Sequence, residues 1–259
     1  MEIIKGLLII AIGSLGQSSS YVPIKKVRKW SWESFWLVQG IFAWLVFPLI
    51  GMLMAIPHDV NPLLLLESGG AGAAIIYGML WGIGGLTFGL SMRYLGVALG
   101  QSVSLGTCSA FGTLFPALFA GTDLLQGDGL ILLLGVMITL TGIAVIGYAG
   151  TLRSQNMSEE EKRAAIKDFA LTKGLAVALL AGIMSACFAL GLDAGTPIKE
   201  TAIANGVPPL YAGLPVILIV TLGGFITNAT YCIYQNIKNK TGKDYLSVNI
   251  SVLLNNILF

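Results

Sequence analysis

The charged residues of this chain lie in short clusters, and the long stretches between them carry almost none. Of 259 residues, 55% are apolar and only 11% are charged, whereas soluble domains carry about 25% charged residues. A soluble fold of this size could not cover its surface with so few charges. A helix needs about 20 apolar residues to cross a bilayer, and several stretches reach that length. The sequence therefore predicts an all-α membrane protein with several spans.

The same pattern excludes several other classes of protein. The apolar stretches are continuous and do not alternate at period two, which argues against a transmembrane barrel. The net charge of +2 is too small to indicate a nucleic-acid partner. The three cysteines lie inside apolar stretches and predict neither a disulfide framework nor a metal site; they are Cys108, Cys187 and Cys232.

We predict seven full spans and the beginning of an eighth. We interpret the first as a retained helix, because polar residues and no small-x-small cleavage site follow its apolar core. The eighth begins near Ser247, and the chain stops at Phe259, which leaves too few residues to cross a bilayer. The predicted full spans are 3–21, 34–56, 71–93, 97–120, 130–149, 174–194 and 211–234.

Lysine and arginine gather in alternate connections between these spans. The first connection, 22–33, carries four of them and the fifth, 150–173, carries five, whereas the second and fourth carry none. Positive residues favour the cytoplasmic side of a membrane. We therefore expect the odd-numbered connections to face the cytoplasm and the N-terminus to face outside.

Spans one and six look alike at both ends. Lys-Gly-Leu at 5–7 recurs at 173–175, and Pro-Ile-Lys at 23–25 recurs at 197–199. A repeat of five spans has an odd number of crossings, so its second copy is inverted. Inverted repeats are typical of secondary transporters, which bind substrate between the halves near the midplane. We predict a first five-helix half over 1–150, a cytoplasmic linker over 151–173 and a second half over 174–259.

The predicted second half is shorter than the first. It holds two spans and the beginning of a third, whereas the first half holds five. We therefore expect the chain to be truncated at its C-terminus relative to two complete halves.

Two segments carry a resemblance to a known family. One is Lys-Lys-Val-Arg-Lys-Trp-Ser-Trp-Glu at 25–33, preceded by Tyr21 and Pro23. The other joins Trp-Gly-Ile-Gly at 81–84 to Gly-Leu-Ser-Met-Arg-Tyr-Leu-Gly at 89–96. With these segments the chain resembles, over essentially its whole length, the bacterial L-rhamnose–proton symporter family of the drug/metabolite transporter superfamily.

The resemblance implies a ten-span transporter of two inverted five-helix halves in the bacterial inner membrane. It implies proton-coupled uptake of L-rhamnose or a similar deoxy-sugar, with the proton as coupling ion and no cofactor or metal. The chain departs from the family by ending inside the eighth span and by having Asp193 where we expect a neutral amide. We therefore expect the 259 residues to insert into the membrane without catalysing coupled uptake by themselves.

A sugar site needs aromatic walls and hydrogen-bonding side chains within the membrane. Tyr77 and Trp81 are four residues apart and so share a helix face; ordinary helix packing explains them equally well. Amides within spans favour a bundle interior or a cavity. The predicted substrate-binding residues are Gln17, Tyr77, Trp81, Gln101 and Asn228.

Proton coupling needs a titratable group within the membrane. Asp193 lies near the outer end of the sixth predicted span, where it either binds the proton or caps the helix. Glu33 lies at the inner mouth, and we prefer to interpret it as a first-turn acid stabilised by the helix dipole. These two acids are the predicted proton-coupling candidates.

Other functions remain to be weighed against a symporter. A metabolite or drug exporter on the same scaffold, or an inactive fragment, fits the same spans. A retinal protein needs a lysine in its last span, and 211–234 has none. The sequence contains neither a phosphate-loop motif nor a nucleophile-elbow motif that would indicate an enzyme. The predicted partners are a sugar and the lipid bilayer; the oligomeric state is left open.

Overall fold

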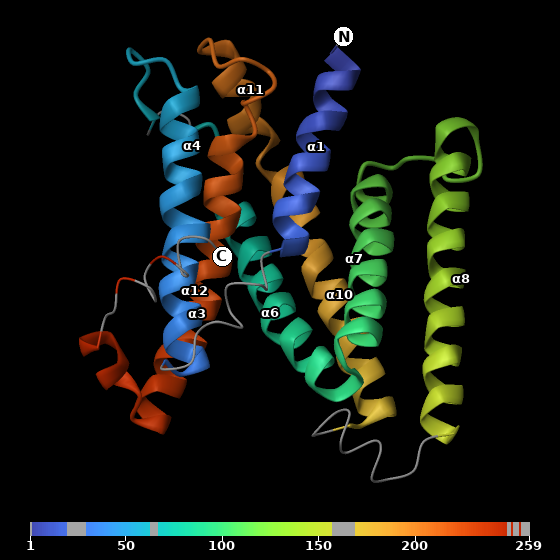
Figure 1. The fold of residues 1–259 in the computed structure, drawn as a ribbon. Helices are drawn as coiled ribbons and strands as arrows, with labels where there is room; N and C mark the ends of the chain where they lie inside the picture. The colour runs from blue at the N-terminus through green and yellow to red at the C-terminus, as the bar shows by residue number, and fades with distance from the viewer. Residues whose placement is uncertain are drawn as a thin grey trace. The chain divides into compact units, whose positions relative to one another are not determined.

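The computed structural model describes residues 2–19, 30–62, 67–156, 169–247, 250 and 254. These residues form helices joined by short connections, and none of them lies in a β-strand (Figure 1). The α-helices are α1 (Glu2–Ser19), α3 (Trp32–Gly40), α4 (Phe47–Ala55), α6 (Ala71–Leu95), α7 (Val97–Phe119), α8 (Gly127–Asn156), α10 (Leu171–Ala194), α11 (Thr196–Ala204) and α12 (Leu214–Asn239). A π-helix, η1 (Ile41–Val46), joins α3 to α4, and a 3₁₀-helix, η2 (Gly242–Leu246), follows α12.

Six helical segments are long and apolar enough to cross a membrane. They match the predicted second to seventh spans to within about five residues at each end, except that Leu171–Ala204 continues past the predicted end at residue 194. Helix α8 itself continues beyond its apolar segment to Asn156. The segments are Trp32–Ala55, Ala71–Leu95, Leu99–Phe119, Gly127–Gly150, Leu171–Ala204 and Leu214–Asn239. The chain is therefore a multi-pass α-helical membrane protein.

The first and eighth predicted spans stand apart from these six. Residues 3–21 were predicted to cross, and α1 is a helix of 18 residues there, but its apolar run Gly6–Gly16 is shorter than a span. Most of the predicted eighth span, from residue 248 onward, lies outside the described residues.

Large apolar side chains are exposed on all sides of the peripheral helices. Ile131, Ile138 and Val145 of α8 are each more than half exposed, as are most large apolar residues of α1. In water this much exposed apolar surface would drive aggregation, whereas in a bilayer it contacts lipid chains. The surface thus supports the membrane assignment independently of helix length.

The chain divides into two compact units. The terminal unit comprises Met1–Phe47 and Ala229–Phe259, and the central unit comprises Pro48–Asn228. The span Trp32–Ala55 and helix α12 each contribute to both units.

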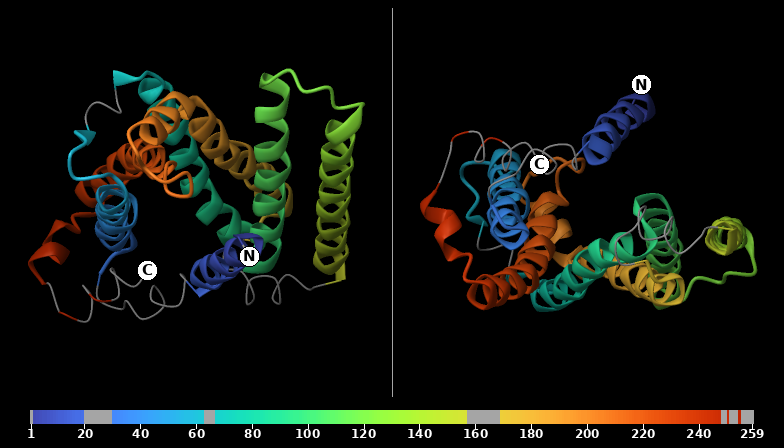
Figure 2. Two further views of the ribbon diagram at one scale, coloured as in Figure 1. Left: turned by 90° about the horizontal axis from the view of Figure 1, so that it is seen from above. Right: turned by 60° about the horizontal axis from the view of Figure 1, so that its bottom comes forward.

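In the central unit α10 packs along both α6 and α7, and α8 packs along α7 (Figure 2). Small residues make the close contacts possible. A Cβ on Gly84 of α6 would lie 2.6 Å from the backbone nitrogen of Ser185 on α10. A Cβ on Gly182 of α10 would lie 2.7 Å from the carbonyl oxygen of Ser104 on α7. Membrane helices lack a hydrophobic drive to associate, so close packing of backbones supplies much of the attraction.

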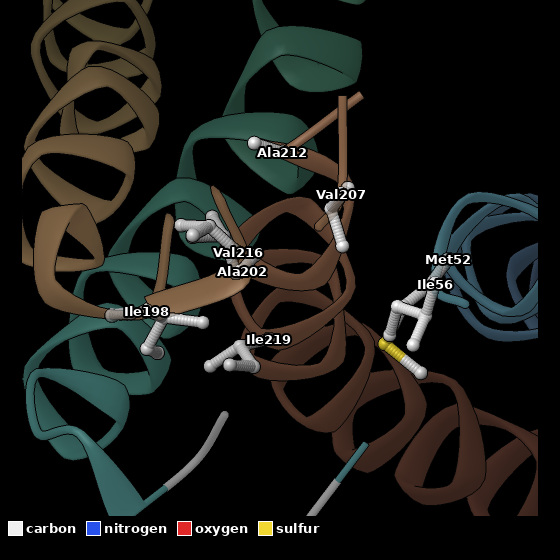
Figure 3. Close-up of a cluster of buried hydrophobic side chains, with 10 residues drawn as sticks. Met52, Ile56, Ile198, Ala202, Val207, Ala212, Val216 and Ile219 are labelled. Atoms are coloured by element: carbon white, nitrogen blue, oxygen red, sulfur yellow. The ribbon is translucent and has the colours of Figure 1, made fainter. Parts of the chain in front are cut away.

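An apolar cluster closes one end of the central unit (Figure 3). The end of α4, the short helix α11, the connection after it and the first turns of α12 all contribute side chains. Ile198 and Ala202 of α11 are fully buried against this cluster. The other members are Met52, Ile56, Ala74, Val207, Ala212, Val216, Ile219 and Val220.

Candidate functional site

Trp81 and Tyr77 are the two aromatic residues predicted to contact the sugar, and both lie in the central unit. The Trp81 ring packs against Phe188 of α10, with ring centroids 5.1 Å apart and planes inclined by 58°. On α12, a Cβ placed on Gly224 would lie 2.5 Å from the Trp81 ring, so only glycine leaves room for the indole there. Trp81 is half-buried and thus keeps part of its ring free of these helices.

Tyr77 lies one turn before Trp81 on α6 and is also half-buried. Its Cβ would lie 3.4 Å from a Cβ placed on Gly191, which is three residues beyond Phe188 on α10. Tyr77 and Trp81 therefore both contact α10, as residues four apart on one helix face can.

Asn228 of α12 lies beside the turn of α6 that carries Trp81. Its side chain is 3% exposed, and its Nδ2 donates to the carbonyl oxygens of Gly224, at 2.8 Å, and Gly82, at 3.3 Å. The neighbouring Thr227 hydroxyl donates to the carbonyl oxygen of Met79 at 3.0 Å. These bonds join α12 to α6 at the point where Trp81 meets Gly224.

The structure brings Tyr77, Trp81 and Asn228 together, and it places the other predicted residues elsewhere. Gln101 is half-buried near the start of α7. Gln17 lies near the end of α1, and its side chain is outside the described part of the structure. Asp193 is exposed in the last turn of α10, where its backbone carbonyl accepts a bond of 2.7 Å from the Thr196 hydroxyl.

Glu33 lies in a second polar cluster, in the terminal unit. It is in the first turn of α3, where Ser31 caps the helix and where an acid favours the helix dipole. The side chain is only 7% exposed. Its Oε1 accepts hydrogen bonds from Asn239 Nδ2, at 2.9 Å, and from Thr241 Oγ1, at 3.0 Å. Glu33 is thus the buried acid among the described residues, and its two donors are neutral.

Asp244 of η2 binds the start of α3 next to Glu33. Its Oδ2 accepts bonds of 2.8 Å from both the backbone N–H and the hydroxyl of Ser31. Partial burial acts to raise the pKa of Asp244, but these bonds and one from Ser34 outweigh it, so the pKa lies below its ordinary value of 3.8. Asp244 therefore stays ionised at neutral pH and binds α3 as a carboxylate.

Asn236 of α12 completes this cluster. Its Oδ1 lies 2.8 Å from Ser34 Oγ and 2.9 Å from Thr241 Oγ1. Its Nδ2 donates to the Tyr245 hydroxyl at 3.0 Å. Burial raises the pKa of Tyr245 above its ordinary value of 10.0, so this hydroxyl keeps its proton. Sequence reasoning missed Asn236, Asp244 and Tyr245, because their partners on α3 lie about 200 residues earlier in the chain.

Neither cluster has the composition of a metal centre. Among the described residues, no group of three or more histidine, cysteine, aspartate or glutamate side chains is placed to hold a metal ion.

Comparison with known proteins identifies the family. The family described as L-rhamnose-proton symport protein (RhaT) matches residues 1–259. The chain belongs to this family. It is a family of transporters and not of enzymes. No solved structure matches the chain.

Curated relatives support the same family. L-rhamnose-proton symporters of Yersinia pestis bv. Antiqua (strain Antiqua) and Yersinia pseudotuberculosis serotype O:3 (strain YPIII) are each 35% identical to this chain over 262 residues. The alignments cover 99% of this chain and 75% of each relative.

Each segment that carries the resemblance to the rhamnose symporters contributes one residue to a cluster: Trp81 to the first and Glu33 to the second. The segment 81–96 begins with Trp81 and ends where α6 gives way to α7 at Gly96. The segment 25–33 ends with Glu33, and its part from Trp30 onward is described. The predicted resemblance is confirmed by the family match, whereas the roles of individual residues remain predictions.

Proposed function

We propose that this chain serves the proton-coupled uptake of L-rhamnose across the bacterial inner membrane. The observation that carries the proposal is the family match over residues 1–259. The Yersinia relatives are named L-rhamnose-proton symporters, and six apolar helices supply the membrane spans. The proton is the coupling ion, and the sugar and the bilayer are the partners.

The proposed sugar wall is the half-buried face of Tyr77 and Trp81. Aromatic faces carry negative potential, which favours contact with the C–H groups of a sugar ring. Asn228, Gln101 and Gln17 are the proposed hydrogen-bonding residues for its hydroxyls. The contacts of Trp81 with Phe188 and Gly224 support this role, because they hold the indole in one orientation.

Glu33 is the proposed proton-binding group, in preference to Asp193. A coupling group must change charge where water is scarce, so that its protonation alters the energy of a conformation. Glu33 is 7% exposed and bound by neutral donors, whereas Asp193 is exposed.

We further propose that the spans follow an inverted repeat of the ten-span type. The first half covers 1–150, the linker 151–173 and the second half begins at 174. The proposed linker includes the last residues of α8, which ends at Asn156, and the first residues of α10, which begins at Leu171. With α1 counted as a span, five spans precede the linker, and an odd number of spans inverts the second copy.

The proposed topology places the N-terminus outside, and cysteine labelling tests it. In a chain whose three native cysteines are replaced, a cysteine at the exposed His58 should react with a membrane-impermeant maleimide in intact cells. A cysteine at Ser158 should react only after permeabilisation. The reverse pattern would overturn the topology.

The uptake of radiolabelled L-rhamnose tests the proposed function. We would express the 259-residue chain, and a chimera extended with the remaining sequence of a Yersinia relative, in cells without their own rhamnose transporter. Uptake that a protonophore abolishes is the expected result. Uptake by the chimera but not by the 259-residue chain would agree with the expectation that the 259 residues insert into the membrane without coupled transport.

The assay also separates the competing function. Rhamnose uptake that is indifferent to the protonophore would refute proton coupling. If neither form takes up rhamnose, but preloaded cells lose substrate faster than controls, the chain is an exporter on the same scaffold.

A further inference from the structure

A row of aromatic rings runs along the terminal unit. Trp32 and Trp36 of α3 stack with centroids 5.3 Å apart and planes inclined by 17°. Trp36 meets Trp44 of η1 edge-on at 5.9 Å. Tyr231 of α12 meets Trp32 edge-on at 6.4 Å. We name these four residues the aromatic row; Trp32 and Tyr231 are exposed, and Trp36 and Trp44 are half-buried.

The π-helix η1 brings Trp44 into this row. In a regular α-helix, residues eight apart are about 80° out of line around the axis. The π-helix hydrogen-bonds to the fifth residue back, as the Phe47 N–H does to the Phe42 carbonyl, so each of its turns holds an extra residue. That extra residue returns Trp44 to the side of Trp36. Short π-helical segments occur frequently at functional sites.

Gln39 belongs to the same face of the helix. It lies three residues after Trp36 and seven after Trp32, which is the spacing of one helical face. Gln39 is 3% exposed, and among the residues that the structure describes none donates a hydrogen bond to its buried Oε1. A buried amide oxygen without a donor is costly, above all inside a membrane. A hydrogen-bond donor brought by a ligand would remove that cost.

Membrane-interface anchoring does not account for the whole row. Tryptophan and tyrosine gather at the two membrane surfaces, where their polar edges meet water. Trp44 lies twelve residues beyond Trp32, about 18 Å along the helix axis. The hydrocarbon core is about 30 Å thick, so the row reaches from one end of the span to past its middle.

We propose that the aromatic row and Gln39 form a binding track for the transported sugar, distinct from the wall at Trp81. The rings contact the C–H faces and the methyl group of a deoxy-hexose, and Gln39 Oε1 accepts a hydrogen bond from a sugar hydroxyl. This inference rests on the proposed function, which supplies the sugar as occupant.

Binding of labelled L-rhamnose to the purified chain in lipid nanodiscs tests the track. Trp36→Leu keeps an apolar surface for lipid but removes the ring, and Gln39→Leu removes the acceptor. We expect each to weaken binding by about tenfold, which corresponds to the loss of one such contact. Trp36→Phe, which keeps a ring, should bind within about threefold of the wild type.

A matched control separates a sugar contact from a lipid contact. Phe47 lies in the same span, is exposed and is outside the row, so Phe47→Leu should leave binding unchanged. Equal affinity of Trp36→Leu, Gln39→Leu and the wild type would refute the track. A loss shared by Phe47→Leu would also refute it, because it would show a general effect of apolar surface.

A panel of sugars distinguishes failure of the track from failure of the proposed function. If the wild type binds another monosaccharide and not L-rhamnose, the proposed substrate is wrong. The track then stands if Trp36→Leu weakens binding of that other sugar, and it falls if Trp36→Leu binds that sugar as the wild type does.

Discussion

Replacing Glu33 by glutamine is expected to abolish accumulation of L-rhamnose while leaving its exchange across the membrane intact. Both hydrogen bonds to Glu33 are accepted by the same oxygen, Oε1. The amide oxygen of glutamine can accept both of these bonds, so the substitution keeps them and removes the ionisable carboxyl group.

The size of the effect follows from the energy of the coupling ion. A membrane potential of 100 mV supplies about 2.3 kcal/mol per proton, which corresponds to a concentration ratio of about 50-fold. The wild-type ratio of internal to external sugar should approach that value. The Glu33→Gln ratio should fall to about one, because exchange without a proton only equalises the two concentrations.

The transporting form of the chain, with or without the Yersinia extension, is the protein to assay. Asp193→Asn is the matched control, since it neutralises an exposed acid on α10, and it should accumulate sugar as the wild type does. The opposite result, with accumulation lost in Asp193→Asn and retained in Glu33→Gln, would assign the proton to Asp193. Loss of exchange in Glu33→Gln would assign Glu33 a structural role only.

Replacing Gly78 by alanine is expected to destabilise the central unit. A Cβ at Gly78 of α6 would collide with the carbonyl oxygen of Val220 on α12, and one at Gly223 of α12 would collide with the carbonyl oxygen of Ile75. Backbone cannot move aside as the end of a flexible side chain can, so the two helices must separate. Overpacking of this kind costs about 1–3 kcal/mol.

Two glycines of the same helix provide the control. Gly85 and Gly89 also lie in α6, and a Cβ at either would have no atom within 4 Å. Alanine is favoured over glycine in a helix by about 1 kcal/mol, so Gly85→Ala and Gly89→Ala should keep or raise the unfolding temperature in detergent. A Gly78→Ala protein that unfolds at or above the wild-type temperature would contradict the packing of α6 on α12.

The spans could be predicted because their signal is local. Each of the six apolar helices satisfies its backbone hydrogen bonds within one segment, and a lipid environment permits little else. The length of an apolar run therefore predicts a helix without knowledge of its neighbours. The first predicted span is the exception, because the apolar run of α1 between Gly6 and Gly16 is short.

Part of the candidate site was also within reach of local patterns. The spacing of Tyr77 and Trp81 predicts one helix face, and the structure shows both in contact with α10. Glu33 is predicted to be a first-turn acid, and the structure places it in the first turn of α3.

The sequence by itself thus determined the class of protein, six of its membrane helices and its family, because hydropathy, helix length and long signature segments are properties of continuous chain. Only the tertiary structure decided which polar groups are satisfied. Asn239 and Thr241 donate hydrogen bonds to Glu33, whereas no residue in the described part of the chain donates one to Gln39 Oε1. Such pairings depend on which helices cross and on which glycines lie at the crossing. Gly224 of α12, for example, lies against the ring of Trp81 on α6. Residues distant in sequence meet only when those backbones pack, so no local pattern encodes the meeting.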